Sequence, residues 1–568
     1  MLAESELIDM PPASILFEIH DPSEHIYYII DGYVELFPSK VCDHKIASVR
    51  SGNLLGETSI LANEPHSFTA RTNKKSQLLK IPKSVFLKFF EEDPEVLMQL
   101  TQFVAKRLRR MVMGLTTESY PFKNIVLYNT VPELSLESFK YYFKEPALQD
   151  NTHIYDKKSF IDSKLDILPF LFQSENTTGI NLFFLEPDDS TWNQHILFHA
   201  EYIYLVVAEE TWEQLPDEIL NKESALCCDI VIWHKNPPPY NNTQEFYARY
   251  PFKRHHHFRD IANHYLRLYR YMTGQAIGLV IGAGGFKGYA HYGIIKAILE
   301  SDIPIDCIGG CSFGAAIGAA LAENFEWEAF KTIYENSIGQ LKNKKRYKLP
   351  FTIPITSLLS GEIATSMLQN VYQDRYIDDI PINFFCVTAN LSTREKEIKK
   401  SGKIWEWLRA SLSLPGIFPP LEKEGNIYVD GAVCTSLPVL DMRQYLNDSG
   451  KVISLDVRSR ELLKDRHKYS FPPVLPFKDV LAYKLGFSKK KLSLPSIFDI
   501  LLESSSIEQY QYDTQGLKKA DLVITADTSS LSFSNPSIGD PQSLIAYTYA
   551  KEKLKEYSVT FKRWIKTQ

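Results

Sequence analysis

The segment Gly-Gly-Cys-Ser-Phe-Gly at residues 309–314 constrains the fold of this chain more than any other stretch. It contains the pattern Gly-x-Ser-x-Gly, in which the glycines allow a serine to occupy a sharp turn between a strand and a helix. We expect the strand at Pro304–Ile308 and the helix at Ala315–Ala322, a run of small residues. The serine hydroxyl then lies at a helix N-terminus, where the helix dipole favours developing negative charge. The pattern predicts that Ser312 is a nucleophile.

A second glycine-rich turn lies upstream. Ala276–Ala283 has the composition of a buried strand, and it is followed by Gly-Gly-Phe-Lys-Gly at residues 284–288 and by an expected helix over Tyr289–Glu300. A turn of this kind directs backbone N–H groups at an anion, which suits an oxyanion hole. A dinucleotide-binding fingerprint and a phosphate-binding P-loop are both excluded, because Lys287 stands where the third glycine should be and is not followed by Ser or Thr. A purely structural turn stays open.

A carboxylate completes the set. Asn426–Ala432 reads Asn-Ile-Tyr-Val-Asp-Gly-Ala and places Asp430 at the end of an expected strand, before a turn glycine. A carboxylate in a dry site has a raised pKa and can accept the proton of a serine hydroxyl. Asp430 is therefore the candidate base, although Asp-Gly is also a common turn. The predicted site residues comprise the catalytic pair Ser312 and Asp430, an oxyanion hole at Gly284, Gly285 and Phe286, and the motif-supporting residues Lys287, Gly288, Gly310, Gly314 and Gly431.

These three ordered motifs resemble those of the patatin-like phospholipases, and most closely those of the neuropathy-target-esterase branch of that family. The segments Pro354–Gly361 and Arg409–Pro420 carry the same resemblance, which runs from about Ala276 to about Asp527. It implies an α/β hydrolase domain with a central, mostly parallel sheet. The chain departs from this branch at Ser436, where Asn is frequent, and this difference concerns substrate preference.

The resemblance also implies the chemistry. Ser312 and Asp430 would form a dyad without a catalytic histidine, so His291, in the helix after the glycine turn, is expected only to pack or to face solvent. The substrate would be a phospholipid or lysophospholipid, hydrolysed at a carboxylic ester through an acyl-enzyme, and neither a metal nor another cofactor would be needed. A lipid acyltransferase with the same dyad and a non-catalytic scaffold protein stay open as alternatives.

The N-terminal region, residues 1–115, resembles a cyclic-nucleotide-binding β-roll followed by a helix at Pro94–Arg110. Alternating apolar residues over Glu24–Phe37, on either side of Asp-Gly, predict a hairpin. Gly56-Glu57 fits the position at which that family binds the ribose, but the family's phosphate-binding arginine falls on His66. A neutral histidine cannot replace the bidentate, always-charged arginine. We therefore expect a β-roll that does not bind cyclic nucleotide.

Residues 120–270 predict a middle α/β domain, and residues 275–568 the hydrolase domain. Buried strands are expected at Asn124–Val131, Ile203–Ala208 and Asp229–Trp233. The triplet His255-His256-His257 is expected in a solvated loop, because adjacent histidines point in different directions and have no partner cluster. The fold class is thus multidomain α/β.

Composition narrows the location and the partners. The net charge of −6 gives no reason to expect a nucleic-acid partner. An acidic N-terminus, seven scattered cysteines and the absence of a long uncharged apolar stretch predict a cytoplasmic protein that meets its lipid at the membrane surface. Two basic runs, Lys342–Lys348 and Lys489–Lys491 (the latter beside Leu485, Phe487 and Leu492), are either solvated faces or contacts with an anionic membrane.

Overall fold

The chain divides into two compact units in the computed structural model. The first comprises Met1–Lys235 and Tyr247–Leu266, and the second comprises Asn236–Phe246 and Arg267–Gln568. The structure describes residues 4–38, 47–50, 53–72, 76–92, 122–210, 228–244, 252–336, 351–457, 473–485, 507–526 and 539–565, except residues 150, 176, 178, 189, 242 and 302. The predicted helix at Pro94–Arg110 and both basic runs lie outside these residues.

The N-terminal part of the first unit consists of two antiparallel sheets. One has the order β1 (Glu6–Met10), β8 (Ser76–Pro82), β3 (His25–Asp31), β6 (Leu54–Leu55), and the other has the order β2 (Ile15–Phe17), β7 (Thr69–Thr72), β4 (Tyr33–Phe37), β5 (Ala47–Arg50). Among the residues that the structure describes here, two helices accompany them, α1 (Glu57–Ala62) and α2 (Lys83–Glu92). Apolar residues of both sheets, among them Ile29 and Val34, form one shared core. The two sheets together are the expected β-roll.

The predicted hairpin over Glu24–Phe37 is wrong. Both strands exist, but β3 pairs with β6 and β8, whereas β4 pairs with β5 and β7. Gly32, with φ +96°, lets the chain pass from one sheet to the other. The alternation of apolar residues showed which faces are buried, but it does not specify which strand lies alongside.

The second part of this unit is a six-stranded parallel sheet. Its order is β10 (Thr152–Tyr155), β11 (Ile180–Leu185), β9 (Asn124–Asn129), β12 (Tyr202–Ala208), β13 (Cys228–Trp233), β14 (Arg254–Phe258). The helices are α4 (Leu136–Gln149), α5 (Lys157–Ser163), α6 (Ile167–Glu175), α7 (Thr191–His199) and α11 (Ala262–Met272), of which α11 extends into the second unit. The three strands predicted here are confirmed.

The prediction of a solvated loop for His255–His257 is wrong, since all three histidines are buried in β14. His257 bonds to the ring of His234 (2.8 Å), and His256 bonds to a buried carboxylate on the neighbouring strand. Asp229 accepts hydrogen bonds from Arg254 Nε (2.8 Å), His256 Nε2 (2.9 Å) and the hydroxyl of Tyr202 (2.6 Å). These side chains satisfy one another's hydrogen-bonding groups, so the polar strand β14 can be buried at the edge of the sheet.

The second unit is built on an eight-stranded, mostly parallel sheet. Its order is β19 (Leu421–Lys423), β20 (Asn426–Asp430), β17 (Asn383–Asn390), β16 (Cys307–Cys311), β15 (Ile277–Ile281), β21 (Lys451–Asp456), β22 (Leu522–Thr525), with β18 (Glu395–Lys399) also paired to β17. The five strands from β17 to β22 in this order run parallel, while β18 and β20 pair antiparallel with β17, and β19 pairs antiparallel with β20.

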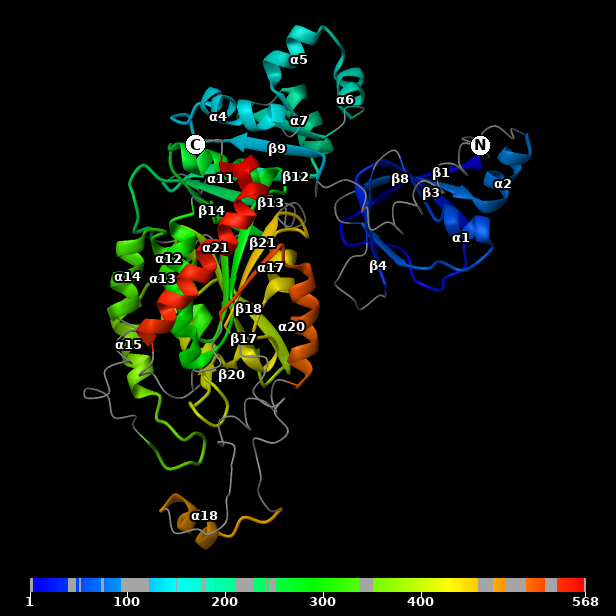
Figure 1. Ribbon diagram of the computed structural model, residues 1–568. Helices are drawn as coiled ribbons and strands as arrows, with labels where there is room; N and C mark the ends of the chain where they lie inside the picture. Colours follow the sequence, from blue (N-terminus) through cyan, green and yellow to red (C-terminus); the bar gives the residue numbers. More distant parts are fainter. Residues whose placement is uncertain are drawn as a thin grey trace. The chain divides into compact units, whose positions relative to one another are not determined.

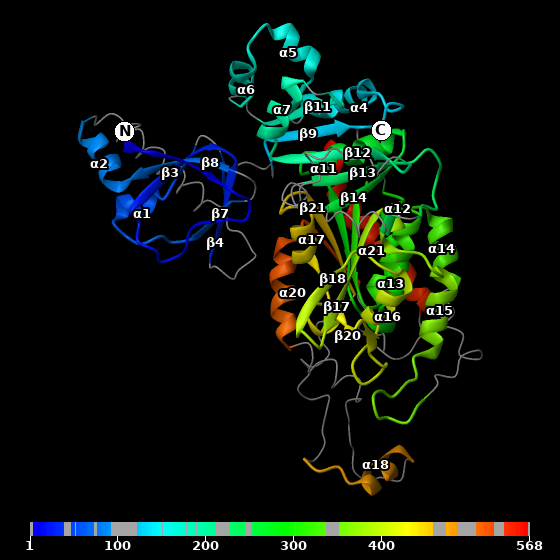
Figure 2. The same cartoon turned by 180° about the vertical axis from the view of Figure 1, so that it is seen from behind.

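Helices cover both faces of this sheet (Figures 1 and 2). One face carries α12 (Ala290–Leu299), α13 (Phe313–Glu323) and α14 (Trp327–Asn336), and the other carries α17 (Val439–Tyr445) and α20 (Ile507–Lys519). The other helices in the described part of this unit are α15 (Glu362–Tyr372), α16 (Ile404–Ser411), α18 (Phe477–Lys484), α21 (Gly539–Ile565) and the 3-10 turns η3 (Gly285–Tyr289), η5 (Ile377–Asp379) and η6 (Gly431–Val433).

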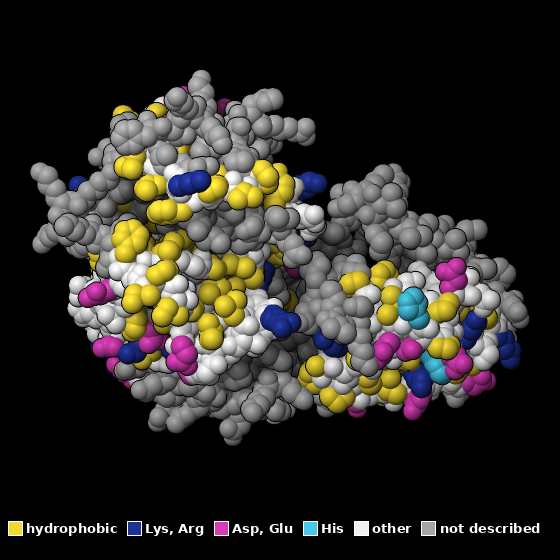
Figure 3. Space-filling view, turned by 90° about the horizontal axis from the view of Figure 1, so that it is seen from below, with side chains coloured by type: hydrophobic (Ala, Val, Ile, Leu, Met, Phe, Trp, Pro, Cys, Tyr) yellow, Lys and Arg dark blue, Asp and Glu magenta, His cyan; other side chains and the backbone are white. Residues whose placement is uncertain are grey.

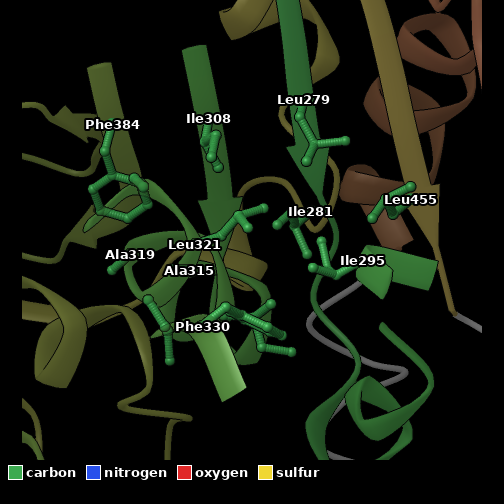
Figure 4. Close-up of a cluster of buried hydrophobic side chains, with 14 of the residues drawn as sticks. Leu279, Ile281, Ile295, Ile308, Ala315, Ala319, Leu321, Phe330, Phe384 and Leu455 are labelled. Atoms are coloured by element: carbon green, nitrogen blue, oxygen red, sulfur yellow. The ribbon is translucent and has the colours of Figure 1, made fainter. Parts of the chain in front are cut away.

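The core lies between the sheet and its first helical face. Figure 4 shows Leu279, Ile308 and Phe384 on three adjacent strands, facing the alanines of α13. Small residues on this helix allow it to lie close to the strands. The strand before Ser312 begins three residues later than predicted, at Cys307 instead of Pro304, because proline has no N–H to pair in a central strand.

Candidate active site

Ser312 occupies a sharp turn between β16 and α13. Its backbone has φ 54° and ψ −126°, a region that residues with a Cβ rarely adopt. Its side-chain hydroxyl donates a hydrogen bond of 2.6 Å to Oδ2 of Asp430. The two residues predicted as a dyad therefore lie in direct contact, although 118 positions separate them in the sequence.

Close packing explains why glycine is needed at two positions, Gly314 after the Ser312 turn and Gly288 in the glycine-rich turn that follows β15. A Cβ built on Gly314 would lie 2.3 Å from the carbonyl oxygen of Ile281, at the end of β15. A Cβ built on Gly288 would lie 2.2 Å from the ring of Phe313. Glycine at both positions lets the start of α13 pack directly against the turn that follows β15. The nucleophile candidate and the glycine turn are thus neighbours.

Asp430 is the last residue of β20 and is almost fully buried. Its Oδ1 accepts the N–H of Ala432 (2.9 Å) and lies 3.9 Å from the thiol sulfur of Cys311, which donates to it. Burial raises the pKa of Asp430 to about 7, while the hydrogen bonds from Ser312, Ala432 and Cys311 act in the opposite direction. Near neutral pH the carboxyl therefore divides between its charged and neutral forms.

The end of α16 holds the backbone of both partners. The N–H of Ser312 donates to the hydroxyl of Ser411 (2.9 Å), and that hydroxyl donates to the carbonyl of Val387 (2.7 Å). Two residues further on, the carbonyl of Ser413 accepts the N–H of Asp430 (2.9 Å). The sequence reasoning noted this segment for its resemblance but missed these contacts, for which the sequence pattern gives no signal.

Arg409 stabilises the same segment, Ser411 to Ser413, through hydrogen bonds of its side chain. Its guanidinium is buried and donates to the hydroxyls of Thr365 and Ser413 and to the carbonyl of Pro419. Burial lowers its pKa to about 10, so it stays charged at neutral pH. Because its partners are uncharged oxygens, its role here is to fix the path of the chain.

The glycine turn begins directly after β15. Gly285–Tyr289 forms the 3-10 turn η3. The first N–H groups of such a turn, which include those of Gly285 and Phe286, have no acceptor within the turn itself. The N–H of Lys287 donates to the carbonyl of Gly284 (3.1 Å), and the Lys287 side chain is buried. This geometry is compatible with the predicted oxyanion hole at Gly284, Gly285 and Phe286.

A buried carboxylate on α20 anchors this turn indirectly. Asp513 accepts hydrogen bonds from the hydroxyl of Thr435 (2.7 Å) and the side-chain amide of Gln509 (3.0 Å). The neighbouring Ser436 bonds through its carbonyl to the N–H of Ala283 (2.8 Å), one residue before the glycine turn. The sequence reasoning missed Asp513 because it lies in a helix far downstream, without a recognisable motif.

His291 does not join the pair. It is fully buried, and its Nε2 donates to the carbonyl of Gly282 (3.0 Å). Burial lowers its pKa to about 4, so the ring is neutral at ordinary pH. The expectation that it packs in the fold is therefore confirmed.

In the first unit, His66 is also an internal residue. Its ring stacks on Phe17 with ring centroids 3.7 Å apart, and burial lowers its pKa. The His66 ring lies beside Gly56, because a Cβ built on Gly56 would lie 3.2 Å from that ring. Gly56 is the residue expected to meet the ribose of a cyclic nucleotide. A neutral, stacked ring offers no charge to a phosphate.

The second unit has the features of one class of protein, the α/β domains that place a serine on a strand-to-helix turn and a carboxylate on a nearby strand. Two segments of the chain match known domain families. Residues 279–443 match the patatin-like phospholipase family, and residues 7–93 match the cyclic nucleotide-binding domain family. The chain therefore contains a patatin-like phospholipase domain behind a cyclic-nucleotide-binding-type domain, which confirms the resemblance and the fold class drawn from the sequence.

Relatives extend this result. Lysophospholipase NTE1 of Saccharomyces cerevisiae is 34% identical over 206 residues, covering 36% of this chain and 12% of the yeast protein. Patatin-like phospholipase domain-containing protein 6 of Pongo abelii is 24% identical over 509 residues, covering 78% of this chain and 37% of that protein. The chain thus spans well under half the length of these relatives. A solved structure, the catabolite activator protein of Thermus thermophilus, is 25% identical over 20% of this chain and 55% of its own, with a TM-score of 0.19.

Among the residues that the structure describes, no helix is both long enough and apolar enough to cross a membrane. Of the residues predicted around the second basic run, Leu485 is described and is exposed.

Proposed function

We propose that this protein hydrolyses a carboxylic ester of a phospholipid or lysophospholipid, with Ser312 as nucleophile and Asp430 as base. The observation that carries the proposal is the 2.6 Å hydrogen bond from the Ser312 hydroxyl to a buried carboxyl whose pKa is raised to about 7. A base with a pKa near the working pH combines a useful population of the basic form with a strong pull on the proton. Relatives named as lysophospholipases and patatin-like phospholipases support the lipid substrate.

The reaction follows from this geometry. The carboxylate of Asp430 accepts the hydroxyl proton as Ser312 Oγ attacks the ester carbon. When the bond from carbon to the alcohol oxygen breaks, Asp430 returns the proton to the departing alcohol. Water then attacks the acyl-enzyme, Asp430 accepts a proton from that water, and the proton passes to Ser312 Oγ as the fatty acid leaves. The dyad ends each cycle as it began.

The negative charge on the former carbonyl oxygen needs donors. The N–H groups of Gly284, Gly285 and Phe286 are the proposed oxyanion hole, because they start the turn that packs against Phe313. One such donor contributes about 3 kcal/mol to the transition state. We propose that the substrate is met by peripheral contact with a lipid surface.

The test is fatty-acid release from lysophosphatidylcholine and phosphatidylcholine by the full chain. Ser312→Ala and Asp430→Asn should each lower the rate by at least about 1000-fold, as loss of a nucleophile or its base does elsewhere. Asp374→Asn serves as the matched carboxylate control, because its side chain is 89% exposed and pairs only at the surface with Lys403. Activity that persists in Ser312→Ala would refute the proposal.

A further inference from the structure

A loop of the second unit is bonded to the segment that follows Ser413. Residues 351–359 double back, with a bridge between Phe351 and Leu359 and a hydrogen bond from the N–H of Thr352 to the carbonyl of Leu358 (3.1 Å). The N–H groups of Leu358 and Leu359 donate to the carbonyls of Gly416 and Ile417, each at 2.9 Å. The base of the loop is therefore fixed by backbone hydrogen bonds.

The two ends of this loop differ sharply in burial. At the base, Leu359 is buried against Leu414 and Ile417. Along the other arm of the loop, Phe351, Ile353 and Ile355 are 76%, 77% and 87% exposed. Residues 351–361 contain no charged side chain. Exposed apolar side chains that gather on an ordered segment mark an interaction surface, because folding alone would bury them. Residues 351–355 are called the apolar loop below.

The apolar loop is tied to the dyad through a short chain of contacts. Gly416 and Ile417, which hold its base, follow Ser413, whose carbonyl accepts the N–H of Asp430. A Cβ built on Gly361 would lie 2.5 Å from the guanidinium of Arg409, which bonds Ser413 from the other side. In the view from below (Figure 3), hydrophobic side chains gather on this end of the second unit.

We propose that the apolar loop inserts into the surface of a phospholipid membrane and so holds the candidate active site against it. The inference rests on the proposed function, because a lipid ester is presented at such a surface. Insertion requires apolar side chains with no buried charge, on a backbone whose polar groups are bonded internally. In the apolar loop, the N–H of Thr352 donates to the carbonyl of Leu358 and the N–H of Ile355 donates to the carbonyl of Ile353, which satisfies two of these polar groups. Residues 351–361 carry no charge, so their insertion among the acyl chains leaves no ion without water.

The test compares vesicle binding by two sets of substitutions, both in the full chain carrying Ser312→Ala so that no lipid is consumed. The loop variant is Phe351→Ser with Ile353→Ser and Ile355→Ser. The control is Leu544→Ser with Ile545→Ser, which removes exposed apolar side chains (65% and 61%) from α21. The probe is a vesicle of phosphatidylcholine alone, whose zwitterionic surface gives basic residues little attraction. We expect the loop variant to lower the ratio of bound to free protein by about tenfold or more, and the control by less than about twofold.

Two rates separate this inference from the proposed function. In the Ser312 form, the loop variant should hydrolyse a soluble short-chain ester at the rate of the unsubstituted protein, while hydrolysis in vesicles falls about tenfold. Absence of hydrolysis by the unsubstituted protein would count against the proposed function alone, because the binding comparison does not need it. Equal vesicle binding by the loop variant and the unsubstituted protein, including no binding by either, would overturn the inference. So would a loop variant that changes only the mass in solution by light scattering, since the loop would then join two copies of the chain.

Discussion

Asp430→Asn should abolish activity and yet make the protein more stable at alkaline pH. The carboxyl is fully enclosed, and burial, its largest influence, raises its pKa from the ordinary value of 3.8 to about 7. The charged form of Asp430 is therefore less stable in the folded protein than in the unfolded chain, and this difference lowers the free energy of unfolding. An amide has the same shape: it can accept the N–H of Ala432 and donate to Ser312 without carrying a charge.

The sign and size of the effect follow from linkage. A carboxyl whose pKa is higher in the folded state binds its proton more tightly there, so stability falls as pH rises from about 4 to about 7. At pH 8 the full difference between 3.8 and about 7 applies, which corresponds to about 4 kcal/mol. At pH 5 the folded form is mostly protonated, and the cost is about 2 kcal/mol. Asn removes this dependence, so the stability of the variant relative to the Asp430 protein should rise by about 2 kcal/mol between pH 5 and pH 8.

Thermal unfolding of both proteins at pH 5 and pH 8 measures this change. An increment of about 2 kcal/mol corresponds to a relative rise of about 4 °C in the Tm of a domain of this size. The comparison of one pair at two pH values cancels whatever the amide changes in packing. The control Asp374→Asn, at an exposed carboxyl, should show no such difference. If Asp430→Asn differs from the Asp430 protein by the same amount at both pH values, the carboxyl does not have a raised pKa and the assignment of Asp430 as the base loses its physical support.

Three further predictions concern the residues around the pair and the first unit. Ser411→Ala leaves the N–H of Ser312 and the carbonyl of Val387 without their partner, so kcat on a soluble ester should fall about tenfold with KM unchanged, and Ser411→Thr should recover most of it. Gly314→Ala places a methyl 2.3 Å from the carbonyl of Ile281 and should lower the free energy of unfolding by about 3 kcal/mol, measured by urea denaturation. Cyclic AMP and cyclic GMP at millimolar concentration should leave the Tm and the hydrolysis rate unchanged, because the neutral ring of His66 is stacked on Phe17; calorimetric binding to either nucleotide would contradict this.

The sequence predicted the elements around the dyad because chemistry and geometry restrict the same positions. The turn at Ser312 needs glycine where the start of α13 meets β15, and this requirement is visible as Gly-x-Ser-x-Gly. Asp430 was found because a strand that ends in Asp-Gly is equally distinctive. Ser411 and Asp513 were missed because other buried hydroxyls or carboxylates could accept the same hydrogen bonds. No spacing in the sequence identifies which residue does so.

The two errors in the first unit share a cause. Period-two alternation showed that β3 and β4 each bury one face, but the pairing partner depends on the whole roll. The three histidines were assigned to solvent because adjacent histidines point in different directions and no partner cluster is visible in the sequence, whereas His256 is bonded to Asp229 and His257 to His234. A polar residue can be buried when its partner is buried with it, and a single sequence does not show which residues become partners.

The absence of histidine from the proposed dyad can be understood from the same energies. In a Ser-His-Asp triad, the imidazole supplies a base whose pKa lies near neutrality, and the aspartate only orients it. An ordinary carboxylate is too weak a base for this role, because its pKa lies near 3.8. Here burial raises the pKa of Asp430 to about 7, which is the range of an imidazole, and the direct 2.6 Å contact with Ser312 replaces the intervening ring. The stability lost by enclosing Asp430 is, on this reasoning, the source of its strength as a base. Position then matters more than in a triad, because nothing stands between the two residues to correct a misplacement. That requirement accounts for a single segment, Ser411 to Ser413, holding the backbone of both.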